Sequence, residues 1–247
     1  MSDQKVDIIA FGVHPDDIEL SCAGTLLSEQ KKGKKTAIID LTMGELGTRG
    51  SAEIRKEEAE NSAKVLKVSF RENLAMKDGF FMNNEENQLK VIRVLRKYRP
   101  EIVLCNAPSD RHPDHGRSAE LVRVAAFLSG LKKIETEYDG KDQEEWRPTY
   151  VFNYIQDQYL QPDFVIDISD VVGEKIEAIK CYKSQFYNKD YKSGEPQTYI
   201  SSPQFLNNVI SRAEELGKQI GVKSAEGYIS AKIVGITSFD SLIKNIT

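Results

Sequence analysis

The chain has 247 residues, of which 40% are hydrophobic, and a formal net charge of −4 at pH 7, which suits one α/β domain with a sizeable core. It contains neither a long basic block nor an apolar run near the roughly 20 residues of a membrane span, so we expect neither nucleic acid nor a membrane as a partner. The three cysteines are widely separated, which favours reduced thiols over a disulfide framework. The N-terminus lacks the apolar centre of a secretion signal, so we expect a cytoplasmic location.

The first 42 residues alternate between an apolar run, an amphipathic segment and a second apolar run. Residues 6–13 are almost continuously apolar, as is typical of a central strand in a parallel sheet. Apolar spacing predicts a helix from about Ile18 to Lys32, and Thr36–Thr42 is the second predicted strand. This order predicts a doubly wound α/β fold with a mostly parallel sheet and helices on both faces.

The remaining elements continue this alternation. Ser51 is expected to cap a helix that runs to about Leu66, and Asp170 to cap another that runs to about Ser184. Further strands are predicted at 69–74, 101–106, 149–155 and 164–168, and further helices at 84–98, 114–128 and 203–220. Residues 225–236 are expected to form a strand or an extended segment. Residues 134–147 are expected to form a surface hairpin or excursion and residues 188–203 a long loop. We expect residues 1–247 to form a single domain.

Two His-Pro-Asp segments contain all three histidines of the chain. Residues 14–17 (HPDD) follow the first predicted strand, and residues 110–115 (DRHPDH) follow the strand at 101–106. Ligands of doubly wound sheets bind beyond the carboxyl ends of the strands, so both segments are expected to meet at one edge of the sheet. The glycine-containing loop at 43–50 would lie at the same edge.

A single His-Pro-Asp segment is commonly a turn, in which proline fixes φ and aspartate caps the next helix. Two such segments at equivalent strand ends, using every histidine, favour a functional site instead. A structural zinc site is disfavoured because such sites are usually rich in cysteine.

The first segment has the composition of a catalytic metal site. Such a site typically has three protein ligands, and His14, Asp17 and His115 would supply them to Zn²⁺; Fe²⁺ also suits two histidines and a carboxylate. His14 and Asp17 are three residues apart and can face the same way. Asp16 is then free to take a proton from water whose pKa the metal lowers.

The second segment offers two histidines, His112 and His115, that are also three residues apart. If His115 binds the metal, His112 can face the substrate, and Asp114 could orient an imidazole through a hydrogen bond. Spacing alone does not decide which histidine is the ligand and which is the acid.

These segments resemble the LmbE/PIG-L family of zinc-dependent N-acetylglucosaminyl deacetylases. The resemblance extends through most of the chain. The full pattern is similar to that of the bacillithiol-biosynthesis branch of the family, which deacetylates N-acetylglucosaminyl malate. Tyr182 departs from the pattern, since many relatives have histidine there. The further matching landmarks are Gly44-Glu45, Gly47-Thr48-Arg49-Gly50, Arg55, Glu58-Ala59, Lys183-Ser184-Gln185 and Ala225-Glu226-Gly227-Tyr228.

The resemblance implies a Rossmann-like fold and a homo-oligomer, which is a hexamer in some relatives. It implies that Asp16 is the general base. It also implies that His112, oriented by Asp114, is the acid that stabilises the oxyanion and protonates the leaving amine. The zinc ligands that it implies are His14, Asp17 and His115.

We therefore expect a hydrolase that removes the N-acetyl group from an N-acetylglucosamine conjugate, with N-acetylglucosaminyl L-malate as the expected substrate. Arg55 and Arg111 are candidates to bind an anionic aglycone, because guanidinium pairs bidentately with carboxylate. Tyr199, in the long loop, is a candidate for a substrate contact. An arginine beside a ligand loop could equally stabilise the fold through an aspartate. The alternatives are deacetylation of an antibiotic precursor, an inositol conjugate or a chitin fragment, and a metal-dependent sugar-binding protein without turnover.

Overall fold

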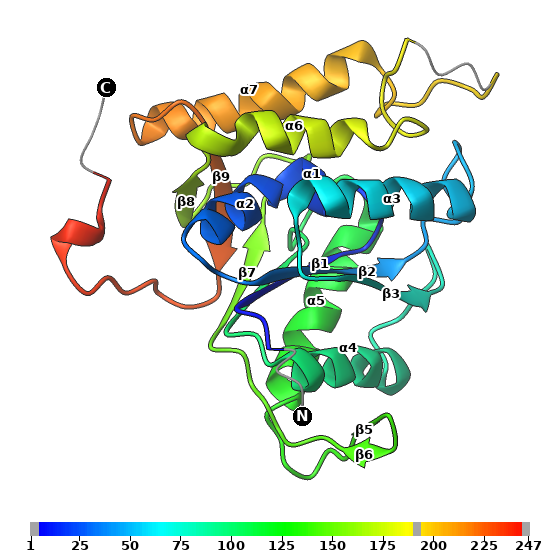
Figure 1. Ribbon diagram of the computed structural model, residues 1–247, viewed down its shortest axis with the longest axis vertical. Helices are drawn as coiled ribbons and strands as arrows, with labels where there is room; N and C mark the ends of the chain where they lie inside the picture. Colours follow the sequence, from blue (N-terminus) through cyan, green and yellow to red (C-terminus); the bar gives the residue numbers. More distant parts are fainter. Residues whose placement is uncertain (1–4, 190–193, 244–247) are drawn as a thin grey trace.

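The computed structural model describes residues 5–189 and 194–243 (Figure 1). In these ranges seven strands form one sheet in the order β3-β2-β1-β4-β7-β9-β8. Neighbouring strands from β3 to β7 are parallel, whereas β9 is antiparallel to both β7 and β8. The expected mostly parallel α/β fold is confirmed. The strands are β1 (Ile8–Gly12), β2 (Thr36–Thr42), β3 (Arg71–Met76), β4 (Ile102–Cys105), β7 (Tyr150–Tyr154), β8 (Phe164–Asp167) and β9 (Ala225–Ser230).

Helices cover both faces of the sheet (Figure 1). Side chains alternate along β1, so that Ile9 and Phe11 join the core under α4 and α5, while Ile8 and Ala10 join the core under α1, α2 and α6. Burial on both faces explains why this strand is almost continuously apolar. One face carries α1 (Asp17–Ser21), α2 (Ala23–Lys31), α3 (Ala52–Leu66), α6 (Val172–Lys180) and α7 (Pro203–Gln219), and the other carries α4 (Glu85–Tyr98) and α5 (Pro113–Leu128).

Several predicted boundaries differ from the structure. Strand β2 and helix α3 have the predicted limits, and Ser51 caps α3 by accepting a hydrogen bond from the Ile54 N–H. The helix predicted after β1 is instead two helices, because the backbone of Cys22 (φ −137°) leaves the helical region. The helix predicted at 170–184 ends at Lys180, follows the 3-10 turn η1 (Ser169–Val171), and has Val171 rather than Asp170 at its cap.

The two predicted irregular segments have different outcomes. Residues 134–147 contain the antiparallel pair β5 (Glu137–Tyr138) and β6 (Lys141–Asp142), so the hairpin is confirmed. In the loop at 188–203, residues 190–193 lie outside the described ranges, as do residues 1–4 at the N-terminus. The strand or extended segment predicted to reach residue 236 is a strand that ends at Ser230, and the exposed segment that follows contains the turn η2 (Phe239–Ser241). No helix in the described part of the chain has the length and apolar character required to cross a membrane.

The order of the strands reverses between β1 and β4. From β1 the chain proceeds outward to β2 and β3, and then returns to place β4 on the other side of β1. In doubly wound sheets a crevice opens at this point, beyond the carboxyl ends of the strands. Because the two His-Pro-Asp segments follow β1 and β4, the fold brings them to one place.

Candidate active site

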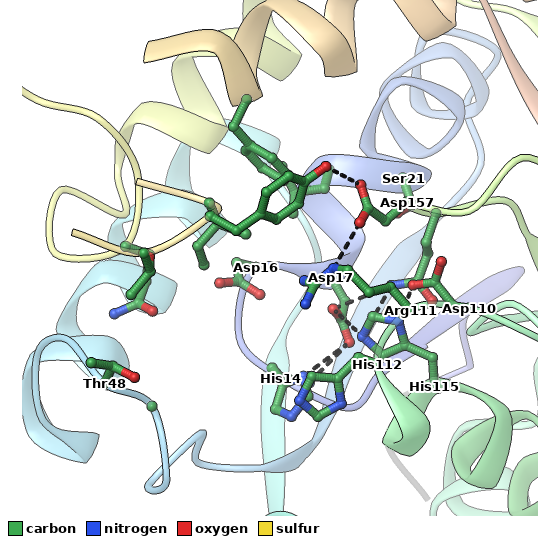
Figure 2. Close-up of a pocket in the computed structure, with 18 of the residues that line it drawn as sticks. His14, Asp16, Asp17, Ser21, Thr48, Asp110, Arg111, His112, His115 and Asp157 are labelled. Atoms are coloured by element: carbon green, nitrogen blue, oxygen red, sulfur yellow. Dashed lines mark hydrogen bonds and ion pairs between the residues drawn. The ribbon is translucent and has the colours of Figure 1, made fainter. Parts of the chain in front are cut away.

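A cavity of about 400 Å³ lies beyond the carboxyl ends of the parallel strands. Figure 2 shows the histidines and Asp17 gathered at one side of it, with Thr48 across from them. Of the predicted site residues, only Asp114 does not line the cavity. Those that do are His14, Asp16, Asp17, Arg55, Arg111, His112, His115 and Tyr199.

The three imidazoles form one cluster. The ring centroid of His112 lies 4.7 Å from that of His14 and 5.3 Å from that of His115. Each of the three rings offers a nitrogen within 4.8 Å of the others. The structure therefore brings the two segments close enough for their histidines to share one ion.

The carboxylate of Asp17 lies between His14 and His115. Its Oδ1 is 3.2 Å from Nε2 of His115, and its Oδ2 is 3.8 Å from Nδ1 of His14. The backbone N–H groups of Val13 and His14 donate to Oδ2 at 2.9 and 3.0 Å. These bonds fix the carboxylate at the start of α1, facing both rings.

Two of the imidazoles contact carboxylates that the sequence analysis does not single out. Nδ1 of His115 lies 2.5 Å from Oδ2 of Asp110, and Nε2 of His14 lies 3.1 Å from Oδ1 of Asp78. An outer carboxylate behind a metal-binding imidazole is a common arrangement, because it fixes the ring and its tautomer. The sequence feature that could have identified these residues is their position after a predicted strand, since Asp78 follows β3 and Asp110 follows β4. Gln156, which follows β7, likewise places Nε2 3.3 Å from Oδ1 of Asp17.

The carboxylate of Asp114 does not have the predicted contact with His112. Its Oδ2 accepts the Gly79 N–H at 2.9 Å and lies 3.9 Å from Nε2 of His14, and its Oδ1 pairs with Arg117 at 2.7 Å. Asp114 reaches His112 through its backbone N–H, which donates to Nδ1 at 3.3 Å. The reason is local geometry: His112 occupies the N-cap of α5, so its ring accepts a backbone hydrogen bond of the first turn.

Asp16 and Arg55 form a buried ion pair in the cavity wall. Nη2 of Arg55 donates to Oδ2 of Asp16 at 3.0 Å and to the Pro15 carbonyl at 2.8 Å, and Nη1 donates to the Gly44 carbonyl at 3.2 Å. This geometry matches the alternative in which the arginine stabilises the fold through an aspartate. Asp16 has a φ of 137°, which is rare for an L-residue. Such strain costs on the order of 1–3 kcal/mol and is concentrated at functional sites.

The environment separates the acid–base properties of Asp16 and His112. Burial raises the pKa of Asp16 to about 7, although the positive charge of Arg55 opposes this shift. Burial lowers the pKa of His112 below its usual value, and the neighbouring His14 and His115 act in the same direction. At neutral pH the carboxyl group is therefore close to its midpoint, and the imidazole of His112 is neutral.

The other two histidines, His14 and His115, each face carboxylates, and these raise the pKa of both imidazoles. Burial alone would lower the pKa of His14, but Asp17 and Asp78 raise it to about 9. Burial would also lower the pKa of His115, but Asp17 and Asp110 outweigh this effect and raise it to about 10. Two imidazoles and one carboxylate are the donors that Zn²⁺ and Fe²⁺ bind, so the residues present fit a divalent metal.

Arg111 and Tyr199 both contact Asp157 at the rim of the cavity. Nε of Arg111 donates to Oδ2 of Asp157 at 2.8 Å, and the Tyr199 hydroxyl donates to Oδ1 at 3.0 Å. The guanidinium of Arg111 also lies 4.8 Å from the centroid of the Tyr199 ring. The guanidinium of Arg111, which was expected to bind a substrate anion, is therefore paired with a carboxylate of the chain itself, and Tyr199 contacts the same carboxylate.

Other residues that carry the family resemblance hold the cavity loops together. Glu58 on α3 accepts both the backbone N–H and the hydroxyl of Ser184 at 2.7 Å, and Nε2 of Gln185 donates to the Arg49 carbonyl at 2.7 Å. Tyr182 is fully buried and does not line the cavity. The departure from the family pattern at Tyr182 therefore lies in the core.

The family model named PIG-L, described as GlcNAc-PI de-N-acetylase, matches residues 9–126. This range begins in β1 and ends in α5, so it includes both His-Pro-Asp segments.

Several known proteins are similar to the chain over most of its length, among them these three. The conserved protein TT1542 from Thermus thermophilus is 31% identical, with a TM-score of 0.84 over 95% of this chain and 98% of that one. Diacetylchitobiose deacetylase from Thermococcus kodakarensis is 27% identical over 89% of this chain and 81% of its own length. A probable N-acetyl-alpha-D-glucosaminyl L-malate deacetylase 2 from Bacillus anthracis is 24% identical over 80% of this chain and 92% of its own.

Proposed function

The chain belongs to the PIG-L family and is similar to deacetylases of N-acetylglucosamine-type substrates, and we propose that its substrate is N-acetylglucosaminyl L-malate. The products would be glucosaminyl malate and acetate, as in bacillithiol biosynthesis. The observation that carries the reaction class is the convergence of His14, Asp17 and His115 beside a buried acid–base residue, Asp16. The malate conjugate is supported by the sequence pattern and by the similarity to the Bacillus anthracis protein.

We propose that Zn²⁺ is the metal and that His14, Asp17 and His115 would hold it; Fe²⁺ suits the same donors. When bound, such an ion lowers the pKa of water and polarises a carbonyl group. Asp110 orients His115, and the backbone bonds to Asp17 keep its carboxylate in place.

We propose that Asp16 is the general base. A pKa of about 7 lets its carboxylate accept a proton from the attacking water at neutral pH, and Arg55 holds the side chain in the cavity wall. The water oxygen forms the new bond to the acetyl carbon, and the bond from that carbon to the sugar nitrogen breaks.

We propose that His112 is the proton donor. Because Nδ1 accepts the Asp114 N–H, the hydrogen of the neutral ring is on Nε2. That N–H can donate a hydrogen bond to the developing oxyanion. When the ring carries a proton on both nitrogens, it can transfer the Nε2 proton to the leaving amine and return to its neutral form. The positioning contact from Asp114 is its backbone amide and not its carboxylate.

The test is acetate release by zinc-loaded enzyme from N-acetylglucosaminyl malate, N,N′-diacetylchitobiose and an N-acetylglucosaminyl inositol. Asp16→Asn preserves the shape of the side chain and its contact with Arg55, and it is expected to lower kcat by about 10²- to 10⁴-fold with unchanged zinc content. His14→Ala is expected to lose zinc. Near-normal turnover by Asp16→Asn would exclude Asp16 as the base, and sugar binding without acetate release would favour the sugar-binding alternative.

We further propose that residues 1–247 form one domain that acts as a homo-oligomer in the cytoplasm. The three cysteines are free, and Cys22 and Cys105 are buried, which suits a reducing compartment. The hexamer known for relatives is the expected assembly.

A further inference from the structure

Arg212 is a cavity arginine with no carboxylate partner among the described residues. It lies on α7, is half-buried and lines the same cavity as the imidazole cluster. Its Nη2 donates to the Leu20 carbonyl at 3.1 Å, and its Nη1 donates to the Gln156 carbonyl. Two other arginines of the cavity, Arg55 and Arg111, are paired with aspartates of the chain.

A guanidinium partly removed from water is poorly compensated by two neutral carbonyls. Burial accordingly lowers the pKa of Arg212, although Asp157 and other carboxylates beyond ion-pair distance oppose the shift. A guanidinium has five N–H donors, so the bonds to the two carbonyls leave donors for a ligand. A carboxylate or phosphate group is the partner that matches this charge and geometry.

Arg212 is also close to the reacting end of the cavity. Gln156, whose carbonyl it binds, places its side-chain amide 3.3 Å from Oδ1 of Asp17 and 3.5 Å from Nε2 of His115. A substrate whose acetamide group reaches these residues therefore has other polar groups within reach of α7. The cavity of about 400 Å³ is in the range of small-molecule sites.

We propose that Arg212 is a specificity-determining residue that binds an anionic group of the substrate remote from its acetyl group. This inference rests on the proposed deacetylase function and deepens it. The substrate class is N-acetylglucosamine conjugates with a carboxylate or phosphate in the aglycone, and neutral chitin fragments are poorer substrates.

A structural alternative gives a different result. If Arg212 only joins the end of α1 to the loop after β7, its loss lowers stability and impairs all substrates alike. If it binds an anion, its loss raises KM for charged substrates and leaves KM for neutral ones unchanged.

The experiment compares wild type, Arg212→Gln and Arg212→Lys on N-acetylglucosaminyl malate, on a phosphate-bearing N-acetylglucosamine conjugate and on N,N′-diacetylchitobiose. Arg212→Gln is expected to raise KM for whichever anionic substrate is used by about 10- to 100-fold, with kcat and the chitobiose kinetics within about twofold. Arg212→Lys should restore part of the affinity. Arg123→Gln is the matched control, because Arg123 is exposed on α5, pairs with Glu120 and does not line the cavity. Equal losses on charged and neutral substrates would overturn the assignment.

If wild type releases acetate from none of these substrates, the proposed deacetylase function is wrong, but the role of Arg212 in binding an anion is still open to a direct test. Calorimetric titration of zinc-loaded wild type and Arg212→Gln with L-malate and with inorganic phosphate then tests the anion site directly. Saturable binding of either anion to wild type that Arg212→Gln loses supports it. Absence of binding to wild type, or equal binding to both proteins, overturns it.

Discussion

At the scale of single residues, the site depends on the carboxylates behind its imidazoles. Oδ2 of Asp110 contacts Nδ1 of His115, while its Oδ1 accepts the Gln158 N–H at 2.5 Å. The aspartate is thus held at both oxygens and fixes the hydrogen of His115 on Nδ1. Nε2, which faces Asp17, is left as a lone-pair donor for a metal.

We expect Asp110→Asn to lower zinc affinity by about 10- to 100-fold. The amide keeps the size of the side chain but has no charge to hold the imidazole N–H. The measurement is competition for zinc against a chromophoric chelator. Asp163→Asn is the control, because Asp163 is exposed, its side chain accepts a hydrogen bond from the Ser230 N–H, and it does not line the cavity. Equal affinity in wild type and Asp110→Asn would show that Asp110 does not orient a metal ligand.

The sequence predicts the histidines of the site better than their partners. His14 and His115 could be found because histidine is rare in this chain and both lie in repeated segments. Asp78 and Gln156 could not be distinguished from ordinary surface residues, because their contacts in the site exist only once separate strands align. Asp110 contacts His115 within its own segment, five residues away, but its spacing does not identify it as the partner of that ring. Their shared position, just beyond a parallel strand, is the usable signal.

At the scale of elements, the loop at 43–50 is shaped around one side chain of α3. Gly44 has a φ of +66°, and a Cβ built there would lie 2.0 Å from Nη1 of Arg55. Arg55 cannot move aside without losing its bonds to Asp16 and Pro15. The loop therefore requires glycine for close approach as well as for backbone conformation.

Gly44→Ala is expected to destabilise the protein and to lower kcat by displacing Arg55 from Asp16. Gly33→Ala is the matched control, because Gly33 also has a positive φ (+85°) but a Cβ there meets nothing within 4 Å. The control should lose about 1–2 kcal/mol from backbone strain alone and retain normal kcat. Urea denaturation and steady-state kinetics provide the two measurements, and identical behaviour of the two variants would contradict the proposed coupling.

The break between α1 and α2 shows why an element boundary was missed. Backbone hydrogen bonds from Cys22 to Ile18 and from Leu26 to Cys22 continue across the break. Apolar residues therefore keep their helical spacing, and periodicity alone predicts one helix. The Ser51 cap gave an accurate start for α3, because its side chain accepts a hydrogen bond from the first turn.

At the scale of the whole molecule, the parallel part of the sheet could be predicted and its far edge could not. From β1 to β7 the alternation of strands and helices implies parallel neighbours. Beyond β7, strand β9 enters between β7 and β8 and runs antiparallel to both. Apolar patterning does not encode which neighbour a strand joins, so this insertion could not be predicted from the sequence.

The segment at residues 231–243 is the least enclosed described part of the molecule. All its residues are exposed, with Ile233 at 99% and Phe239 at 81%. Figure 1 shows it extending from β9 away from the helices and the sheet. Apolar side chains gathered on an exposed surface commonly mark a contact with another protein, and a second copy of the chain is the partner that the proposed homo-oligomer supplies.

We expect full-length protein to be oligomeric by size-exclusion chromatography with light scattering. The double variant Ile233→Ser with Phe239→Ser should dissociate it into smaller species, because the variant removes apolar area from the contact and leaves β9 intact. Lys232→Ser is the control, since it changes an exposed polar residue of the same segment. Zinc content should be equal in all three proteins, because the segment contributes no residue to the cavity lining. A monomeric wild type, or an oligomer unaffected by the double variant, would exclude this segment as the contact between copies.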